Sequence, residues 1–78
     1  MPRFYFDFGD DGGTTIDNGG EEFPSIDAAK QEALAALGDA TKDYVRHHFQ
    51  GRLTIRIRDN EGAILEVSAT LETQLIRL

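Results

Sequence analysis

The chain has 78 residues, a formal net charge of −6 and no cysteine. This length allows one domain, residues 1–78, and the composition excludes disulfides and thiolate chemistry. No apolar run approaches the roughly 18 residues of a membrane span, and the N-terminal segment turns acidic instead of resembling a secretory signal. We therefore expect a soluble, cytoplasmic protein without a membrane partner. The acidic balance opposes binding to a phosphate backbone, so nucleic acid is a disfavoured partner.

The N-terminal segment Arg3–Phe8 alternates between aromatic and polar residues, which predicts a strand. Its inner face is expected to carry Phe4, Phe6 and Phe8. Its outer face is expected to carry Arg3, Tyr5 and Asp7. A turn rich in glycine and aspartate follows at 9–13, and residues 14–17 are expected to return as a short strand.

A long helix is predicted over about residues 25–50, because apolar residues recur there every three or four positions. Ser25 is suited to cap the first turn, and Gly51 is suited to end the helix. The apolar stripe keeps its phase across Gly38, which favours one helix; a break into two helices at Gly38 is the alternative. The expected inward residues are Ile26, Ala29, Ala33, Leu37, Ala40 or Thr41, Tyr44 and His48, flanked by Leu34, Val45 and Phe49.

Two more alternating segments, Arg52–Arg58 and 65–75, predict an antiparallel hairpin. A three-residue loop at 60–62 keeps the apolar residues of both strands on one face and places Gly62 where the turn needs a left-handed backbone. The expected inner pairs are Ile57 with Leu65, Ile55 with Val67, and Leu53 with Ala69. On the outer face the expected pairs are Arg56 with Glu66, and Thr54 with Ser68.

Together these elements predict an α+β fold of the order ββαββ, with one long helix (about 25–50) packed on one face of a four-stranded antiparallel or mixed sheet. In the predicted register, residues 71–78 extend past the end of the strand that begins near Gly51. We therefore expect the last strand to pair with the first strand there, which makes the first and fourth strands central. If the overhang is unpaired, its edge is available to another subunit.

Several short motifs occur in a fixed order along the chain: the opening MPRFYFDF, the acidic turn DDGG, the stretch DNGGEEFP at 17–24, the helix start AAKQEAL, the hairpin RDNEG and the closing ATLETQLIRL. With these motifs nearly the whole chain resembles a family of small bacterial domains of unknown function, which has an MPRxYF strand, an acidic DG turn, the pattern D-x-x-G-x-E-[LF]-P and an alanine-rich helix. The resemblance implies the ββαββ layout and a bacterial origin, and it implies no activity. A looser likeness of layout links the chain to HicB-type antitoxins, whose Pro-Gly-Cys element is missing here.

The acidic loop partly matches a calcium-binding loop, in which oxygen ligands surround a hard cation. The matching residues are Asp7, Asp11 and Gly12, with Asp17 just beyond. Gly9 stands at a ligand position, however, and Asn18 replaces the bidentate glutamate. The pattern therefore favours an ordinary turn, and no metal site or cofactor is predicted.

Catalytic residues are not predicted either, and we do not expect an enzyme. His47 and His48 are adjacent, so on a helix they point about 100° apart and do not share a ligand. Ser25 is used as a helix cap, and Ser68 faces outward from a strand. Neither serine lies in the glycine elbow that exposes a nucleophile.

The outer face of the sheet is the most interesting candidate surface, because an aromatic residue lies there among arginines. The predicted interaction residues are Arg3, Tyr5, Arg52, Arg56 and Arg58, with Leu71 and Leu75 on the long last strand. Acidic residues share this face and favour a solvated ladder of charges. The leading hypothesis is a non-enzymatic module that binds a protein partner or itself as a homo-oligomer. The alternatives are a divalent-ion module that uses the acidic Gly/Asp loop and a nucleic-acid or antitoxin-like regulator.

Overall fold

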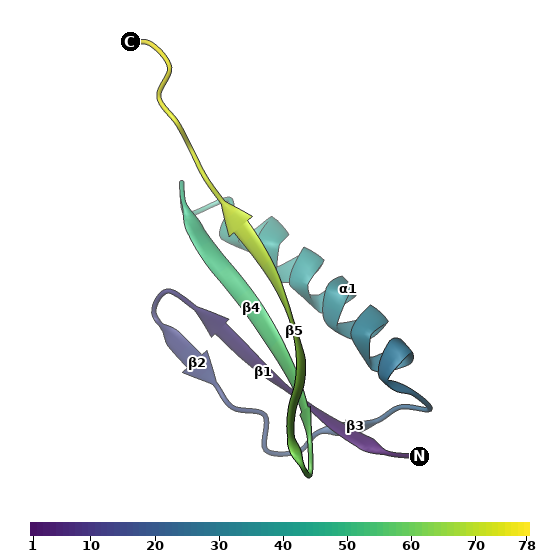
Figure 1. Ribbon diagram of the computed structural model, residues 1–78. Helices are drawn as coiled ribbons and strands as arrows, with labels where there is room; N and C mark the ends of the chain where they lie inside the picture. The colour runs from purple at the N-terminus through teal and green to yellow at the C-terminus, as the bar shows by residue number, and fades with distance from the viewer.

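The computed structural model describes residues 1–78 as an α+β fold in which one helix covers one face of an open antiparallel sheet (Figure 1). The elements follow in the order β1 (Arg3–Asp10), β2 (Gly13–Thr15), β3 (Glu21–Glu22), α1 (Ile26–Tyr44), β4 (Gly51–Asp59) and β5 (Gly62–Leu71). The sheet has the order β2-β1-β4-β5, and the short β3 also pairs with β1. The predicted α+β class is confirmed, but the sheet has five strands instead of four, because residues 21–22 form an additional short strand.

The central strands of the sheet are β1 and β4, so the prediction that the first and last strands are central was wrong. Phe6 of β1 lies opposite Ile57 of β4, and Phe8 lies opposite Ile55. The three inner residues of β4, which include Leu53, are apolar and buried. A central position suits this strand, because neighbouring strands on both sides shield these residues from water. The inner residues of β5 are only partly buried, which agrees with its place at the edge.

The hairpin of β4 and β5 has the predicted register. The inner pairs are Ile57 with Leu65, Ile55 with Val67, and Leu53 with Ala69, and the outer pairs are Arg56 with Glu66 and Thr54 with Ser68. A shift in register between Ile57 and Arg58 then brings Asp59 opposite Gly62. Gly62 has a φ of 123°, which it adopts without penalty because it lacks a Cβ atom.

α1 is one unbroken helix that passes through Gly38, but it ends earlier than predicted. Ser25 caps it as expected, since its Oγ accepts a hydrogen bond from the amide of Ala28 at 3.1 Å. The helix ends at Tyr44, because residues 45–50 carry the chain back to the sheet, where Gly51 begins β4 instead of ending the helix. No helix in the structure combines the length and hydrophobicity that crossing a membrane requires.

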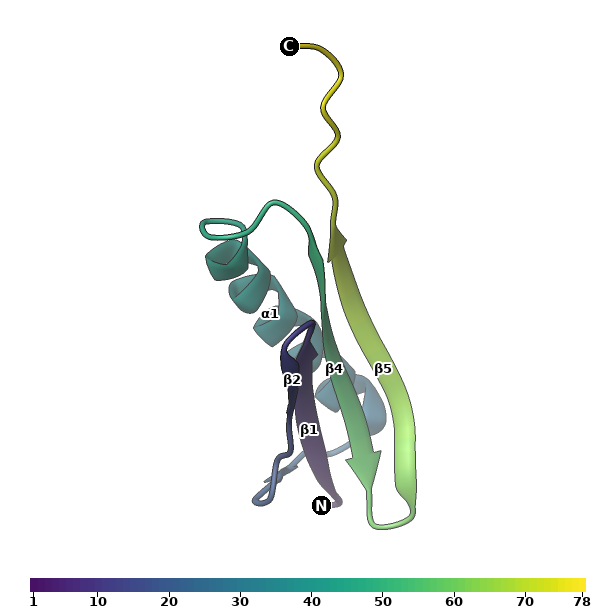
Figure 2. The ribbon, with the colours of Figure 1, turned by 90° about the vertical axis from the view of Figure 1, so that its left-hand side faces the viewer.

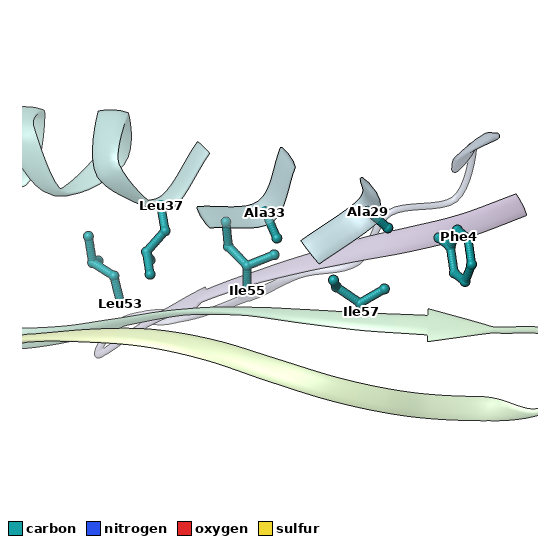
Figure 3. Packing of buried hydrophobic residues seen from close by; sticks show 7 residues of the cluster. All are labelled: Phe4, Ala29, Ala33, Leu37, Leu53, Ile55 and Ile57. Carbon is teal, nitrogen blue, oxygen red and sulfur yellow. The ribbon is translucent and has the colours of Figure 1, made fainter. Parts of the chain in front are cut away.

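The core lies between α1 and the two central strands (Figure 3). It consists of the seven buried residues Phe4, Ala29, Ala33, Leu37, Leu53, Ile55 and Ile57. Ala29 and Ala33 are fully buried, and their short side chains allow the helix to lie close to β4. Four residues of the predicted helical stripe are instead exposed: Leu34, Val45 and Phe49, at 50 %, 46 % and 81 %, and His48. The predicted stripe therefore includes residues that the sheet does not cover.

Residues 72–78 leave the sheet and project from one end of the molecule (Figure 2). The last pair of the hairpin joins Leu71 to Gly51, and the predicted pairing of the following residues with β1 does not occur. The hydroxyl group of Thr73 donates to the carbonyl oxygen of Phe49, which anchors the first part of this segment. The projecting segment contributes to an elongated molecule, with principal extents of 55 × 21 × 17 Å.

The position of Gly38 gives a test of the continuous helix. A Cβ atom added there meets no atom of the rest of the molecule within 4 Å. Because glycine is a poor helix former, we expect Gly38→Ala to raise the free energy of unfolding by about 1 kcal/mol, measured by urea denaturation. Gly20→Ala is the contrasting variant and should lower the free energy of unfolding. The φ of this glycine is 68°, and an added Cβ would lie 2.8 Å from the carbonyl oxygen of Phe4. An unchanged or lower stability of Gly38→Ala would contradict a regular helix at this point.

Candidate functional site

The arginines singled out in the sequence are gathered on the sheet face opposite the helix. β1 contributes Arg3 and Tyr5 to this face, and β4 contributes Arg52, Arg56 and Arg58. The structure thus brings these five residues to one surface, which the alternation of the strands had predicted. Their contacts decide which of them are free to meet a ligand.

Arg58 makes three contacts within the molecule. Its Nε donates to Oδ2 of Asp7 at 2.8 Å, and its Nη2 donates to the carbonyl oxygen of Asp17 at 2.7 Å. Its guanidinium carbon lies 4.6 Å from the centroid of the Tyr5 ring, a cation–π distance. Asp7 is only 7 % exposed, although the sequence pattern placed it on the outer face. The pair therefore joins the two central strands beneath a covering loop.

The covering loop is held by the side chain of Asp17. Oδ2 of Asp17 accepts a hydrogen bond from the amide of Phe6 at 3.1 Å, and Oδ1 accepts from the amides of Gly19 and Gly20, each at 3.1 Å. The amide of Asp17 in turn donates to Oδ1 of Asp7 at 2.9 Å. One carboxylate thus organises the loop and ties it to β1. The sequence motif at 17–24 indicates a turn here, but it does not predict that Asp17 bonds to β1.

The pKa values of the two carboxyl groups reflect these bonds. Burial alone would raise the pKa of Asp7, but the hydrogen bond from Arg58, the amide of Asp17 and the Arg58 charge together lower it. The pKa of Asp17 is also lowered, first by the amides of Phe6 and Gly20. The hydrogen bond to Asp7 raises the pKa of Arg58. The charged forms of all three groups are therefore favoured.

The other arginines of this face also have partners, but at the solvent-exposed surface. Arg56 lies 3.2 Å from the carboxylate of Glu66, as expected from the cross-strand pairing. Nη1 of Arg52 donates to the hydroxyl oxygen of Thr70 at 3.4 Å. Arg3 donates to the carbonyl oxygen of Gly19 at 3.0 Å and lies 4.0 Å from Glu22. An incoming ligand would thus compete with existing contacts at every arginine.

The acidic loop has few carboxylates left for an ion. Asp7 and Asp17 are engaged as described, and Oδ1 of Asp10 accepts from the amide of Gly12 at 2.8 Å. No group of three or more His, Cys, Asp or Glu side chains is placed to hold a metal ion. The aspartates that partly match a calcium-binding loop thus accept hydrogen bonds from the backbone of their own loop, as in an ordinary turn.

The two histidines lie outside the helix, in the connection to β4. The ring of His48 stacks on the ring of Tyr44, with centroids 3.9 Å apart and planes inclined by 5°, and its Nδ1 is 3.2 Å from the Tyr44 carbonyl oxygen. Tyr44 donates to the carbonyl oxygen of Gln50 at 3.3 Å. Burial, with smaller effects from Asp11 and Asp10, raises the pKa of Tyr44. These contacts close the end of the helix onto the start of β4.

The edge of the sheet and the projecting segment supply the remaining candidate residues. Leu71 is half-buried in the last pair of the hairpin, whereas Leu75 is 72 % exposed. Sequence analysis did not single out Ile76 and Leu78, which are 85 % and 106 % exposed. The sequence feature that could have identified them is the cluster of apolar residues after the end of the hairpin. We call residues 72–78 the C-terminal tail.

Comparison with protein families assigns the chain to a group without a known activity. Residues 3–70 match the model of a family described as a domain of unknown function (DUF6894), and the chain belongs to this family. The matched segment includes all strands of the sheet except Leu71, the last residue of β5, while the C-terminal tail lies beyond it. No curated protein and no solved structure gives a significant match.

The buried pair predicts a large effect of mutation. Asp7→Ala leaves the half-covered Arg58 guanidinium without its carboxylate, and we expect the free energy of unfolding to fall by about 2 kcal/mol. Glu22→Ala is the matched control, because the Arg3–Glu22 pair is about half-exposed and should contribute less than about 1 kcal/mol. Urea denaturation measures both. Similar losses for the two variants would contradict the special place of the Asp7–Arg58 pair.

The lowered pKa values predict a loss of stability in acid. The pKa of Asp7 and of Asp17 is lowered on folding, so the unfolded chain binds protons more readily, near its ordinary pKa of about 3.9. The contribution of these groups is complete above about pH 5 and is lost as the pH falls through about 4 and below. We expect Asp7→Asn to flatten this dependence in urea denaturation series between about pH 6 and pH 3. Equal slopes for Asp7→Asn and the original protein would refute the assignment.

Proposed function

We propose that this member of the DUF6894 family is a non-enzymatic protein-interaction module, which binds an extended segment of a protein partner or of itself along β5 and the C-terminal tail. The observation that carries this function is the free edge of β5. β5 has ten residues and pairs with β4 on one side only. Every second residue of such an edge presents an amide and a carbonyl group to solvent, ready to pair with another strand.

The two edges of the sheet differ in ways that favour β5 as the binding edge. The opposite edge is formed by two short strands that both pair with β1, β2 with three residues and β3 with two. β5 contains no proline and no lysine, the residues with which proteins commonly protect a long edge. Glu66, the one acidic side chain in β5, forms an ion pair with Arg56. β5 is therefore both the longer and the less protected edge.

The tail adds apolar surface in line with this edge. Leu75 and Ile76 are 72 % and 85 % exposed, and the tail that carries them continues from the end of β5, as Figures 1 and 2 show. Burial of apolar surface is the main favourable term in protein association. The edge would give main-chain hydrogen bonds, as in strand-addition complexes, and the tail would add hydrophobic contact.

The arginine-bearing face supports a second binding route less well. Arg58 is bound to Asp7 and to the loop, and Arg56 is bound to Glu66. A partner at this face would have to replace contacts that already exist, whereas the β5 edge offers groups that lack a partner. The edge is therefore the surface on which we base the function.

A photo-crosslinking residue in the tail tests this proposal. Replacing Ile76 with a photoreactive amino acid in the full chain, expressed in cells of its natural source, should give adducts with a protein, either another protein or a second copy. The matched control carries the same group at Glu32, which is exposed on α1. Mass spectrometry of the adducts identifies the partner. Adducts at position 76 no more abundant than those at position 32 would refute the proposed function.

A further inference from the structure

We infer that the strand that completes the free edge is β5 of a second copy of this chain, paired antiparallel about a two-fold axis at Thr70. This assignment names the partner in the function proposed above and therefore rests on it. It follows from the symmetry of strand pairing, from the position of two glutamates and from the exposed apolar residues of the tail.

Symmetry restricts how two identical strands can pair. In an antiparallel pair related by a two-fold axis, one residue lies opposite itself, and the numbers of any two opposite residues add up to twice the number of that residue. Opposite residues then have the same parity, so the inner residues of one copy meet inner residues of the other, as the pleat requires. Both helices consequently lie on the same face of one continuous sheet.

Two glutamates exclude several positions of the axis. Glu66 and Glu72 are exposed in and just after β5. An axis at either residue sets a glutamate opposite its own copy, and an axis at Ala69 sets Glu66 opposite Glu72 of the second copy. Like charges placed directly opposite in a strand pair are destabilising. Axes at Val67 and Ser68 also avoid these contacts, but they place Leu75 and Ile76 beyond the start of the other β5 at Gly62. The axes that let the tail pair with β5 are therefore at Thr70 and at Leu71.

The apolar residues distinguish these two positions. With the axis at Thr70, the apolar pairs between the copies are Ile64 with Ile76, Leu65 with Leu75, and Ala69 with Leu71. The glutamates are then opposite the neutral residues Gln74 and Ser68. With the axis at Leu71, Ile76 would lie opposite Glu66, and Arg77 would lie opposite Leu65. Only the axis at Thr70 gives both apolar residues Leu75 and Ile76 an apolar partner.

This arrangement covers the surface that a single copy leaves open. Ile64, Leu75 and Ile76 are 42 %, 72 % and 85 % exposed in the single chain, and each gains a cross-strand neighbour. The tail becomes a continuation of β5, so that its backbone groups pair with the edge of the second copy. The tail of each copy then lies along the N-terminal half of the other β5.

Engineered disulfides test the position of the axis, and the chain offers a clean background because it has no cysteine. Opposite Cα atoms in antiparallel strands are about 4.5–5.5 Å apart, within the range that a disulfide bridges. Thr70→Cys should therefore form a disulfide-linked dimer with itself under mild oxidation. A mixture of Ser68→Cys and Glu72→Cys should link to each other, whereas Glu72→Cys alone should not.

Non-reducing gel electrophoresis measures the linked fraction, with Glu32→Cys on α1 as the control for random collision. Linkage of Thr70→Cys at least ten times faster than that of Glu32→Cys is the expected result. Equal rates for these two variants would overturn the inference, and preferential self-linkage of Glu72→Cys would overturn the register.

Sedimentation velocity separates this inference from the proposed function. The original protein should sediment with twice the monomer mass of 8.7 kDa, and the double variant Leu75→Asp, Ile76→Asp should fall to the monomer mass. Both residues are exposed, so this variant should retain the circular dichroism spectrum of the fold. A monomeric original protein at all concentrations overturns the second copy as partner. In that case crosslinks from position 76 to another protein would still support the proposed function, and their absence would refute both.

Discussion

The contact between Arg58 and Asp7 is the interaction on which the rest of the structure depends. It joins β4 to β1, strands that are far apart in the sequence, and it does so on the face that the helix does not cover. Arg58 also holds the backbone at Asp17, whose carboxylate gathers the amides of the loop that leads to β3 and the helix. The loop in turn covers the Asp7 carboxylate, while the Arg58 side chain keeps 29 % of its surface exposed. The outer layer of this sheet is therefore a polar network, while the inner layer is a hydrophobic core.

This division suits a small domain. Seven residues form the hydrophobic core, and a chain of this length buries a smaller part of its surface than a large protein does. Breaking a hydrogen-bonded ion pair with a buried carboxylate destabilises a protein because an uncompensated charge remains. The network therefore favours the native pairing of β1 with β4 over other arrangements. The cation–π contact of Arg58 with Tyr5 adds apolar cover on the same face. Specific pairing of strands is thus secured on both faces of the sheet.

Much of this fold could be predicted from the sequence, and the errors have common physical causes. The register of β4 and β5 was predictable because a shift by one residue would bury arginine, and the capping role of Ser25 followed from its position before the apolar stripe. An alternation of period two shows which face a side chain occupies but not which strand lies beside it, so the central position of β4 was missed. The end of the helix at Tyr44 depends on the return path to Gly51, which periodicity does not contain. The burial of Asp7 depends on a loop contact with Asp17, and no local pattern reveals such a contact.

The unequal edges of the sheet have a consequence for the size of any assembly. A strand that pairs with its own copy uses up the same edge in both molecules. The opposite edge consists of the three residues of β2 and the two residues of β3, which are too short to recruit another sheet. Growth by edge pairing would then stop at two chains, whereas a protein with two long edges could continue into a fibre. Because the edge opposite β5 is so short, the protein can expose a long strand without the hazard of open-ended polymerisation.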